Sequence, residues 1–215
     1  MKRSYKDLIK GLITNDRVCL SKLISSIESD PSSIFKIIDS VKRIPNKVYT
    51  IGVTGPPGAG KSTLTNQIIK KFRSMDLKIG VIAIDPSSPF TGGAVLGDRV
   101  RMQEHSLDTS VFIRSVGSRG DLGGLSSSTS SMIKLFDIFG MDIVIIETVG
   151  VGQTELDIIK ISDSVLVTLV PEAGDGIQAM KAGLMEIGDI FIVNKADRGG
   201  AEKLAREIDY MVSLK

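Results

Sequence analysis

The sequence predicts an α/β protein with a doubly wound, mostly parallel sheet and a small helical segment in front of it. Between about residues 48 and 193, short runs of β-branched and other apolar residues alternate with helix-like stretches. The runs show no polar alternation, which is expected of parallel strands buried on both faces. Helical crossovers between parallel strands give right-handed βαβ units. We therefore predict a helical segment over residues 1–46 and an α/β domain over residues 47–215.

The first 46 residues have the spacing of helices. Apolar residues recur at helical intervals within residues 8–13 and 20–27, and a third helix is expected over residues 32–41, after Pro31. Cys19 is the only cysteine, which excludes an internal disulfide and fits a reducing compartment. We expect Cys19 to be a buried apolar residue of the second helix.

Six apolar runs are the expected strands of the α/β domain. They cover residues 48–53, 78–84, 111–113, 143–146, 164–170 and 190–193. Ligands of a doubly wound sheet bind beyond the carboxyl ends of its strands. The polar or small residues found at these ends, namely Gly55, Asp85, Glu147 and Asn194, are therefore the first candidates for function.

The residues after the first run read GPPGAGKS, the GxxxxGK[ST] pattern of a phosphate-binding P-loop. The motif lies between an expected strand and a helix-like stretch over residues 64–72, as it requires; a Gly- and Pro-rich turn with a chance lysine is the alternative. Backbone N–H groups can then point at phosphate oxygens at a helix N-terminus. Lys61 can reach the outer phosphates, and Ser62 can offer its hydroxyl to Mg²⁺. The expected nucleotide-binding residues are Gly55, Pro56, Pro57, Gly58, Ala59, Gly60, Lys61, Ser62 and Thr63.

A second motif, NKAD, follows the last apolar run and predicts the base. The Asp197 carboxylate can accept hydrogen bonds from N1–H and the N2 amino group of guanine, a donor pair that adenine lacks. Asn194 can brace the neighbouring loop, and the stem of Lys195 can cover the face of the base. A helix-capping turn is the structural alternative for these four residues.

A metal ion beside the phosphates needs hard oxygen ligands. Ser62, Asp85, Asp98 and Glu147 are the candidates. Glu147 opens the stretch ETVGVGQ, in which the Gly150 N–H could contact a γ-phosphate. The alternatives are a surface charge for Glu147 and turn capping for Asp85 and Asp98.

The connection over residues 86–110 is long for a compact domain, which favours a loop that responds to the nucleotide. Arg99 and Arg101 could meet phosphates there or be solvent-exposed. His105, the only histidine, is expected to be solvated, and a structural zinc site is not expected.

The bulk properties exclude several classes of function. A formal net charge of +2 gives no argument for nucleic-acid or membrane binding. No apolar run approaches the ~20 residues that span a bilayer. Without a secretion-signal core behind the charged N-terminus, the expected compartment is the cytoplasm.

Taken together, the motifs resemble the MeaB/ArgK/MMAA family of P-loop GTPases, whose older members carry the label of lysine/arginine/ornithine transport ATPases. The matching stretches are VTGPPGAGKSTL, VIAIDPSSPFTGGAVLGDRVRM, FIRS, LGGLS, ETVGVGQTE, AGDGIQAMKAG and NKAD. The resemblance implies a GTP-dependent chaperone that gates cofactor loading and protection of a cobalamin-dependent acyl-CoA mutase. A kinase linked to amino-acid transport is the alternative, and a nucleotide-binding module without activity is a third hypothesis.

The resemblance also implies roles for single residues. It assigns Lys61 and Ser62 to phosphate and Mg²⁺, and Asp85, Asp98 and Glu147 to the metal and catalytic region. Gln153 falls in the second switch segment, and Lys181 in a segment that communicates with the mutase.

The chain departs from the family pattern in two places. The segment Pro171–Gln178 differs from the usual PGAGDELQ, and Lys181-Ala182-Gly183 stands where the family has KKG, which concerns partner coupling. Family members also continue well past NKAD. A chain that stops at Lys215 is expected to be a fragment or a short relative, with weaker guanine binding and a weakened dimer contact.

Overall fold

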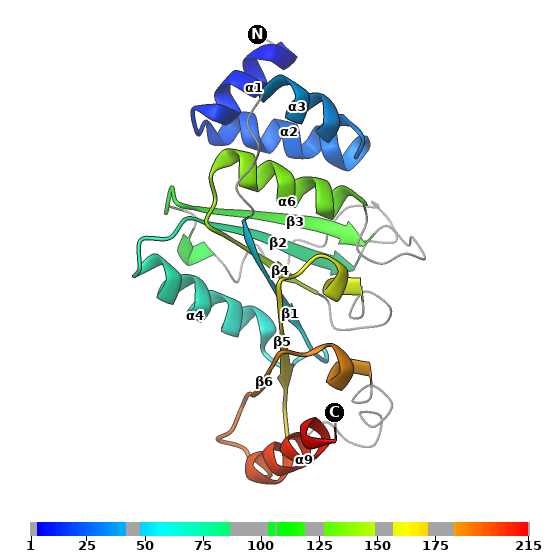
Figure 1. Cartoon of the computed structure of the whole chain (residues 1–215). Coiled ribbons are helices and arrows are strands. Elements are labelled where there is room, and N and C mark those ends of the chain that lie inside the picture. Colours follow the sequence, from blue (N-terminus) through cyan, green and yellow to red (C-terminus); the bar gives the residue numbers. More distant parts are fainter. Residues whose placement is uncertain are drawn as a thin grey trace.

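A six-stranded sheet organises the computed structural model of the chain, and all of its strand pairings are parallel (Figure 1). The structure describes residues 4–41, 48–86, 103–105, 107–118, 127–148, 157–171 and 183–214. The strand order is β3-β2-β4-β1-β5-β6, which confirms the predicted doubly wound α/β fold. The strands are β1 (Tyr49–Thr54), β2 (Ile79–Pro86), β3 (Val111–Ser118), β4 (Ile143–Glu147), β5 (Ser164–Leu169) and β6 (Ile190–Val193).

Six α-helices have their bounds within the described residues, and a further helical stretch covers residues 183–187. The six are α1 (Tyr5–Ile13), α2 (Arg17–Ser29), α3 (Ser33–Val41), α4 (Lys61–Arg73), α6 (Ser127–Phe139) and α9 (Ala201–Ser213). Two short 3₁₀ helices, η1 (Gln103–His105) and η2 (Ile158–Lys160), lie between strands.

The strand β3 is longer than the sequence predicts. The apolar run ends at Ile113, yet the strand continues through Arg114 and Ser115 to Ser118. Within the described residues β3 is an edge strand that pairs with β2, and its side chains project from the faces of the sheet and not toward a neighbouring strand. The Arg114 guanidinium is instead ion-paired with Glu28 of α2, so a charged residue is accommodated inside the strand.

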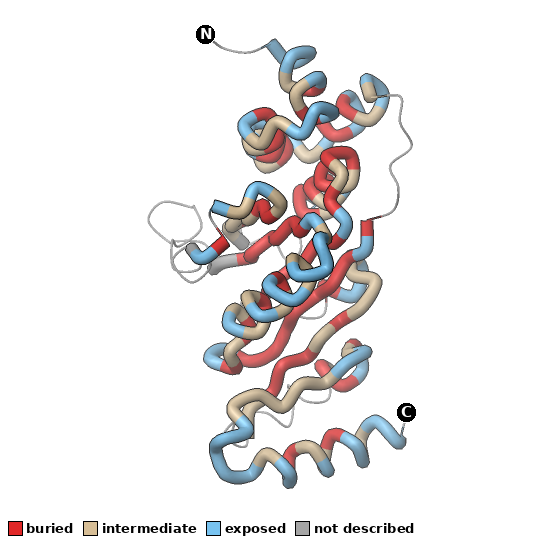
Figure 2. The backbone as a smooth tube through the Cα atoms, turned by 90° about the vertical axis from the view of Figure 1, so that its left-hand side faces the viewer, coloured by how far each residue is buried: buried red, intermediate tan, exposed pale blue. Residues whose placement is uncertain are grey.

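Two apolar layers lie on opposite faces of the sheet. On one face, alternate residues of the central strands, such as Ile51, Val53 and Ile145, pack with Ile69 of α4. On the other face, Val144 and the remaining strand residues pack with α6. Most of the strand length is therefore buried, whereas β6 remains partly exposed (Figure 2). The layers place the start of α4 at the carboxyl ends of the central strands.

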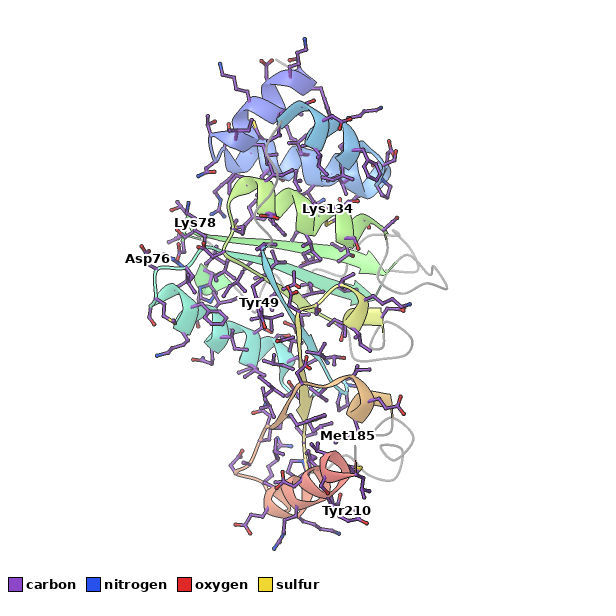
Figure 3. All side chains as sticks on the ribbon, viewed as in Figure 1. Tyr49, Asp76, Lys78, Lys134, Met185 and Tyr210 are labelled. Carbon is purple, nitrogen blue, oxygen red and sulfur yellow. The ribbon has the colours of Figure 1, made fainter. Side chains whose placement is uncertain are left out.

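The N-terminal helices stack on the outer side of α6, away from the sheet (Figure 1). Cys19 of α2 is fully buried, as predicted. Ser131 of α6 donates a hydrogen bond to the Pro31 carbonyl (3.2 Å). Lys134 of the same helix, which is labelled in Figure 3, lies over the Phe35 ring at 5.7 Å. Apolar residues of α1–α3, α6 and the sheet belong to one continuous core. The division of the chain at residue 46 remains a prediction.

The segment from η1 to β3 is attached to the exposed flank of α4 by polar contacts. Asn66 and Lys70 of α4 contact His105 and Glu104, at 2.5 Å each. The prediction that His105 is solvated was wrong, because its side chain is only 7% exposed and its Nε2 meets the Asn66 amide oxygen. The polar neighbours of His105 in the sequence gave no indication that a helix 39 residues away would cover it.

Asp108 joins three parts of the fold. Its Oδ2 accepts a hydrogen bond from Arg73 Nε of α4 (2.8 Å), and its Oδ1 accepts one from the Ser110 N–H (2.8 Å). Its backbone carbonyl accepts a third from Arg17 of α2 (3.0 Å). The hydrogen bond from Arg73 holds the pKa of the Asp108 carboxyl below its usual value, and the Ser110 amide adds to the effect.

We expect Asp108→Asn to lower the free energy of unfolding at pH 7 by about 1 kcal/mol, because it removes the charge that Arg73 contacts. A depressed pKa stabilises the fold above the ordinary carboxyl pKa, and this stabilisation is lost as pH falls through the folded value. The difference between wild type and variant should therefore close below about pH 4.

Urea denaturation of both proteins from pH 7 to pH 3 measures this difference. Asp76→Asn is the matched control, because Asp76 lies 3.6 Å from the same arginine but its side chain is fully exposed. We expect a much smaller effect from it. A difference for Asp108→Asn that stays constant down to pH 3 would contradict the assignment.

Candidate nucleotide-binding site

The loop between β1 and α4 contains three glycines with positive φ: Gly55 at 137°, Gly58 at 75° and Gly60 at 88°. Two of them also leave no room for a side chain. A Cβ on Gly55 would lie 2.1 Å from the Thr168 carbonyl oxygen, and a Cβ on Gly60 would lie 2.4 Å from Asn194 Nδ2. The loop conformation therefore needs glycine for its backbone angles and for its close contacts with β5 and the NKAD turn.

Lys61 is the first residue of α4 and is only 6% exposed. Its Nζ donates hydrogen bonds to the carbonyls of Gly55 (2.8 Å) and Pro56 (3.1 Å), so the ammonium group lies against the loop itself. The first turn of α4 carries no acidic residue. The positive end of the helix dipole and the ammonium charge thus act together, which favours an anion at this end of α4.

Ser62 and Glu147 bring a hydroxyl and a carboxylate together. Ser62 Oγ donates to Glu147 Oε1 at 2.5 Å, and the Glu147 side chain is buried, at 3% exposed. Glu147 ends β4, opposite Val53 of β1 and Ala83 of β2. Hydroxyl and carboxylate oxygens are the ligands that Mg²⁺ prefers.

The donor set is small, and this also fits Mg²⁺. Within the described residues, no group of three or more His, Cys, Asp or Glu side chains could hold a metal ion. Mg²⁺ usually takes one or two protein ligands and completes its shell with water and substrate phosphates. Ser62 and Glu147, at the phosphate loop (residues 55–63), meet that requirement without a cage of carboxylates.

The NKAD turn touches the phosphate loop directly. Asn194 Nδ2 donates to the Ala59 carbonyl (2.8 Å), while the Asn194 N–H donates to the Leu169 carbonyl at the end of β5 (2.8 Å). Lys195 has φ of 56°, an uncommon value for a residue with a side chain, and its carbonyl accepts from the Arg198 N–H (3.0 Å). Asp197 is exposed in this turn. The Asn194 brace predicted from the sequence is therefore present.

The structure thus brings together the loop residues 55–63, Glu147 and residues 194–197. Within this loop Pro57, Gly58 and Thr63 are exposed, whereas Pro56 and Ala59 are buried. Asp85 lies near the end of β2, opposite Gly117, and nothing is described for its side chain. The candidates Asp98, Gly150, Gln153 and Lys181, together with Arg99 and Arg101, lie outside the described residues.

Sequence reasoning missed two polar contacts of this region, the first buried and the second partly buried. One is the hydrogen bond from Thr148 to Thr54, and the other joins Asn66 to His105. The only available signal for the first is that a hydroxyl residue directly follows Glu147 and another directly precedes Gly55. Nothing in the sequence indicates that these two hydroxyls meet.

A left-handed glycine loop between a parallel strand and a helix, with a lysine and a serine at the start of that helix, defines a P-loop nucleotide-binding protein. The chain belongs to the family described as Methylmalonyl Co-A mutase-associated GTPase MeaB, whose model matches residues 20–215. This confirms the family that the motifs indicate.

Relatives and solved structures agree with this membership. The chain is 51% identical over 208 residues to a protein of Pyrococcus horikoshii, covering 97% of this chain and 66% of that protein. It is 37% identical over 193 residues to GTPase ArgK of Escherichia coli, covering 88% of this chain and 58% of ArgK. It is also 34% identical over 224 residues to the mitochondrial Methylmalonic aciduria type A homolog of Mus musculus, covering 97% of this chain and 54% of the relative.

A crystal structure of LAO/AO transport system kinase has a similar fold, with a TM-score of 0.72 and 27% identity, covering 98% of this chain and 63% of that one. The chain therefore spans about two thirds or less of the length of these proteins. Among the described residues, no helix is both long and apolar enough to cross a membrane.

We expect Gly60→Ala to weaken GDP binding at least about tenfold, because the added Cβ combines an unfavourable φ with a clash against the Asn194 amide. Calorimetric titration with GDP measures the affinity. Gly140→Ala is the matched control, since Gly140 has φ of 86° but no atom within 4 Å of an added Cβ. It should lower stability through backbone strain and leave GDP affinity unchanged. Equal GDP affinity in wild type and Gly60→Ala would contradict the assigned role of the loop.

Proposed function

We propose that the chain binds GTP and hydrolyses it in a Mg²⁺-dependent reaction at the loop over residues 55–63. The observation that carries the proposal is the hydrogen bond from Asn194 to the Ala59 carbonyl, 2.8 Å long. It fixes the turn that would read the base beside the loop that would hold the phosphates. A P-loop alone binds any nucleoside triphosphate, whereas a P-loop joined to NKAD favours the guanine nucleotide.

The residues take the following proposed roles. Backbone N–H groups of the loop and Lys61 hold the phosphates, and Ser62 and Glu147 hold the metal side, with Asp85 and Asp98 as further candidates. When bound, Mg²⁺ would neutralise the charge that develops on the transferring phosphoryl group. Asp197 accepts hydrogen bonds from guanine, and Lys195 covers the base. Gly150 and Gln153 are proposed to contact the γ-phosphate side.

The contribution of the protein to hydrolysis is mainly positioning and electrostatics, as in other phosphoryl transfers. Lys61 has a low-dielectric surrounding, so its charge interacts strongly with a phosphate group. In the described structure its ammonium contacts two loop carbonyls, which would have to share it with the phosphate. We assign no arginine to the transition state, and we therefore expect slow turnover that a partner increases.

We further propose that the partner is a cobalamin-dependent acyl-CoA mutase, for which the protein acts as a GTP-dependent chaperone. The family description, which names a methylmalonyl-CoA mutase, supports this partner. Lys181 is proposed to transmit the nucleotide state to it. The cytoplasm is the proposed compartment, because a chain with one cysteine fits a reducing environment.

The alternative is phosphotransfer to a component of amino-acid transport. The name of the LAO/AO transport system kinase, whose structure resembles this fold, favours it. Incubation with GTP labelled at the γ-phosphate separates the two proposals. A kinase transfers the label to a protein or small-molecule acceptor, whereas a GTPase releases it as phosphate.

We expect the protein to hydrolyse GTP and not ATP, and we expect Asp197→Asn to lower GDP affinity about 100-fold. The amide NH₂ group of asparagine is a donor, and guanine also presents donors at this point. A hydrogen bond is therefore lost, and two donor groups face each other. Calorimetry with GDP and ADP and phosphate-release assays measure both effects. Glu202→Gln, at an exposed position of α9, is the control and should behave as wild type. Equal affinity of the wild type for GDP and ADP would refute guanine recognition.

We also expect a cobalamin-dependent methylmalonyl-CoA mutase to raise the rate of GTP hydrolysis. Single-turnover rates measured with and without a molar excess of the mutase test this expectation. Bovine serum albumin at the same concentration controls for non-specific stabilisation. Equal rates with mutase and with albumin would argue against the chaperone proposal and leave nucleotide hydrolysis untouched.

A further inference from the structure

Thr54 and Thr148 form a buried hydroxyl pair directly behind the proposed metal side of the site. Thr54 is the last residue of β1, just before Gly55, and Thr148 follows Glu147, the last residue of β4. Thr148 Oγ1 donates a hydrogen bond to Thr54 Oγ1 at 3.0 Å. Thr54 is 0% exposed and Thr148 is 2% exposed.

The pair lies on the opposite face of the sheet from Ser62 and Glu147. Along β1, Ile51 and Val53 point into the layer beneath α4, so Gly52 and Thr54 point to the other face. Gly52 accordingly faces the side chain of Ile158 in η2. The threonine side chains therefore point away from Ser62 and Glu147, and we expect any effect of the pair on the nucleotide to pass through the backbone.

Two side-chain hydrogen bonds close a ring around the phosphate loop. From Thr54 the chain runs through the loop to Ser62, which donates to Glu147 at 2.5 Å. Glu147 is followed by Thr148, which returns to Thr54 at 3.0 Å. The Thr148 N–H also donates to the Val53 carbonyl at 3.1 Å. Thr148, the residue after Glu147, is thus held to β1 both by its backbone N–H and by its side-chain hydroxyl.

Hydroxyl groups at these two positions need a reason, because the strands around them consist mainly of valine and isoleucine. Valine has nearly the same shape as threonine, so packing alone would be served by two valines. A buried hydroxyl is unfavourable unless it is hydrogen-bonded, and once bonded it fixes direction as well as distance. The pair therefore specifies orientation at the end of β4, where Glu147 must meet Ser62.

We infer that Thr148 and Thr54 are positioning residues that hold the Glu147 carboxylate against Ser62 and so set the affinity of the site for Mg²⁺. This inference rests on the proposed function, because it assigns a role toward the Mg²⁺–nucleotide complex. Residues that support metal ligands from behind typically change metal affinity 10- to 100-fold when they are substituted. The ring predicts a selective effect on the metal, with the phosphate loop itself unchanged.

The experiment compares Thr148→Val, Thr54→Val and the double variant with wild type. For each protein, GDP affinity is measured by calorimetry with Mg²⁺ and with EDTA, and the melting temperature is recorded. We expect Thr148→Val to reduce the Mg²⁺-dependent gain in GDP affinity about tenfold and to leave the affinity in EDTA within about twofold. Each single variant should also melt about 2–4 °C lower, because the remaining hydroxyl is buried without its partner.

The double variant separates positioning from packing. Two valines leave no unsatisfied hydroxyl, so the melting temperature should return close to the wild-type value. The Mg²⁺-dependent gain should stay reduced, because packed methyl groups do not fix the direction of the peptide unit. Thr148→Ser keeps the hydroxyl and should keep the gain.

Recovery of both melting temperature and Mg²⁺-dependent gain in the double variant would overturn the inference, and so would a wild-type gain in Thr148→Val. Failure of the proposed function is recognised separately, in the wild type. A wild type that binds no GDP, or binds it equally with Mg²⁺ and EDTA, overturns the proposed function and this inference with it. A wild type with a clear gain leaves the variants as the only test of the pair.

Discussion

The close approach of β5 to Gly55 is the constraint on which the site depends. The Thr168 carbonyl lies where any side chain at residue 55 would have to begin. The phosphate loop can therefore leave β1 only with a glycine at this position, and it leaves between β4 and β5, the two neighbours of β1 in the sheet. Because the neighbouring strands end at the same edge, Glu147 from β4 and Asn194 from β6 reach the loop from opposite sides. The strand order thus decides which polar residues can meet at the nucleotide end.

Charge at this edge is arranged around the start of α4. The helix dipole and Lys61 make the loop electropositive. The buried carboxylate of Glu147 accepts a hydrogen bond from Ser62, the next residue of α4 after Lys61. A buried carboxylate is costly unless its charge is compensated, and the positive end of α4 supplies part of that compensation. Mg²⁺ would complete it, which gives a physical reason for a glutamate at the end of an otherwise apolar strand. The same arrangement explains why a hydroxyl residue, and not an apolar one, occupies position 62.

Much of this fold and of the site could be predicted from the sequence, and the limits have physical causes. Buried parallel strands show as apolar runs, and the P-loop shows because its glycines and lysine have few substitutes. The end of β3 could not be predicted, because Arg114 is accommodated only through an ion pair with Glu28, 86 residues away. The burial of His105 and the contact between Thr148 and Thr54 likewise depend on residues that only the folded chain brings together. Side-chain pairs of this kind leave no periodic trace in the sequence.

The outer flank of α4 adds a further constraint. Asn66, Lys70 and Arg73 follow Ser62 at intervals of four, four and three residues and so continue along one side of the helix. Each contacts the segment that leads into β3, and the same segment accepts hydrogen bonds from Arg17 through the carbonyls of Asp108 and Thr109. A displacement of α4 would therefore break charged contacts along its length. It would also disturb the segment to which Arg17 of α2 is hydrogen-bonded. The helix that presents Lys61 and Ser62 is held at its start by the loop and along its flank by this segment. The position of those two residues consequently depends on the N-terminal helices as well as on the phosphate loop.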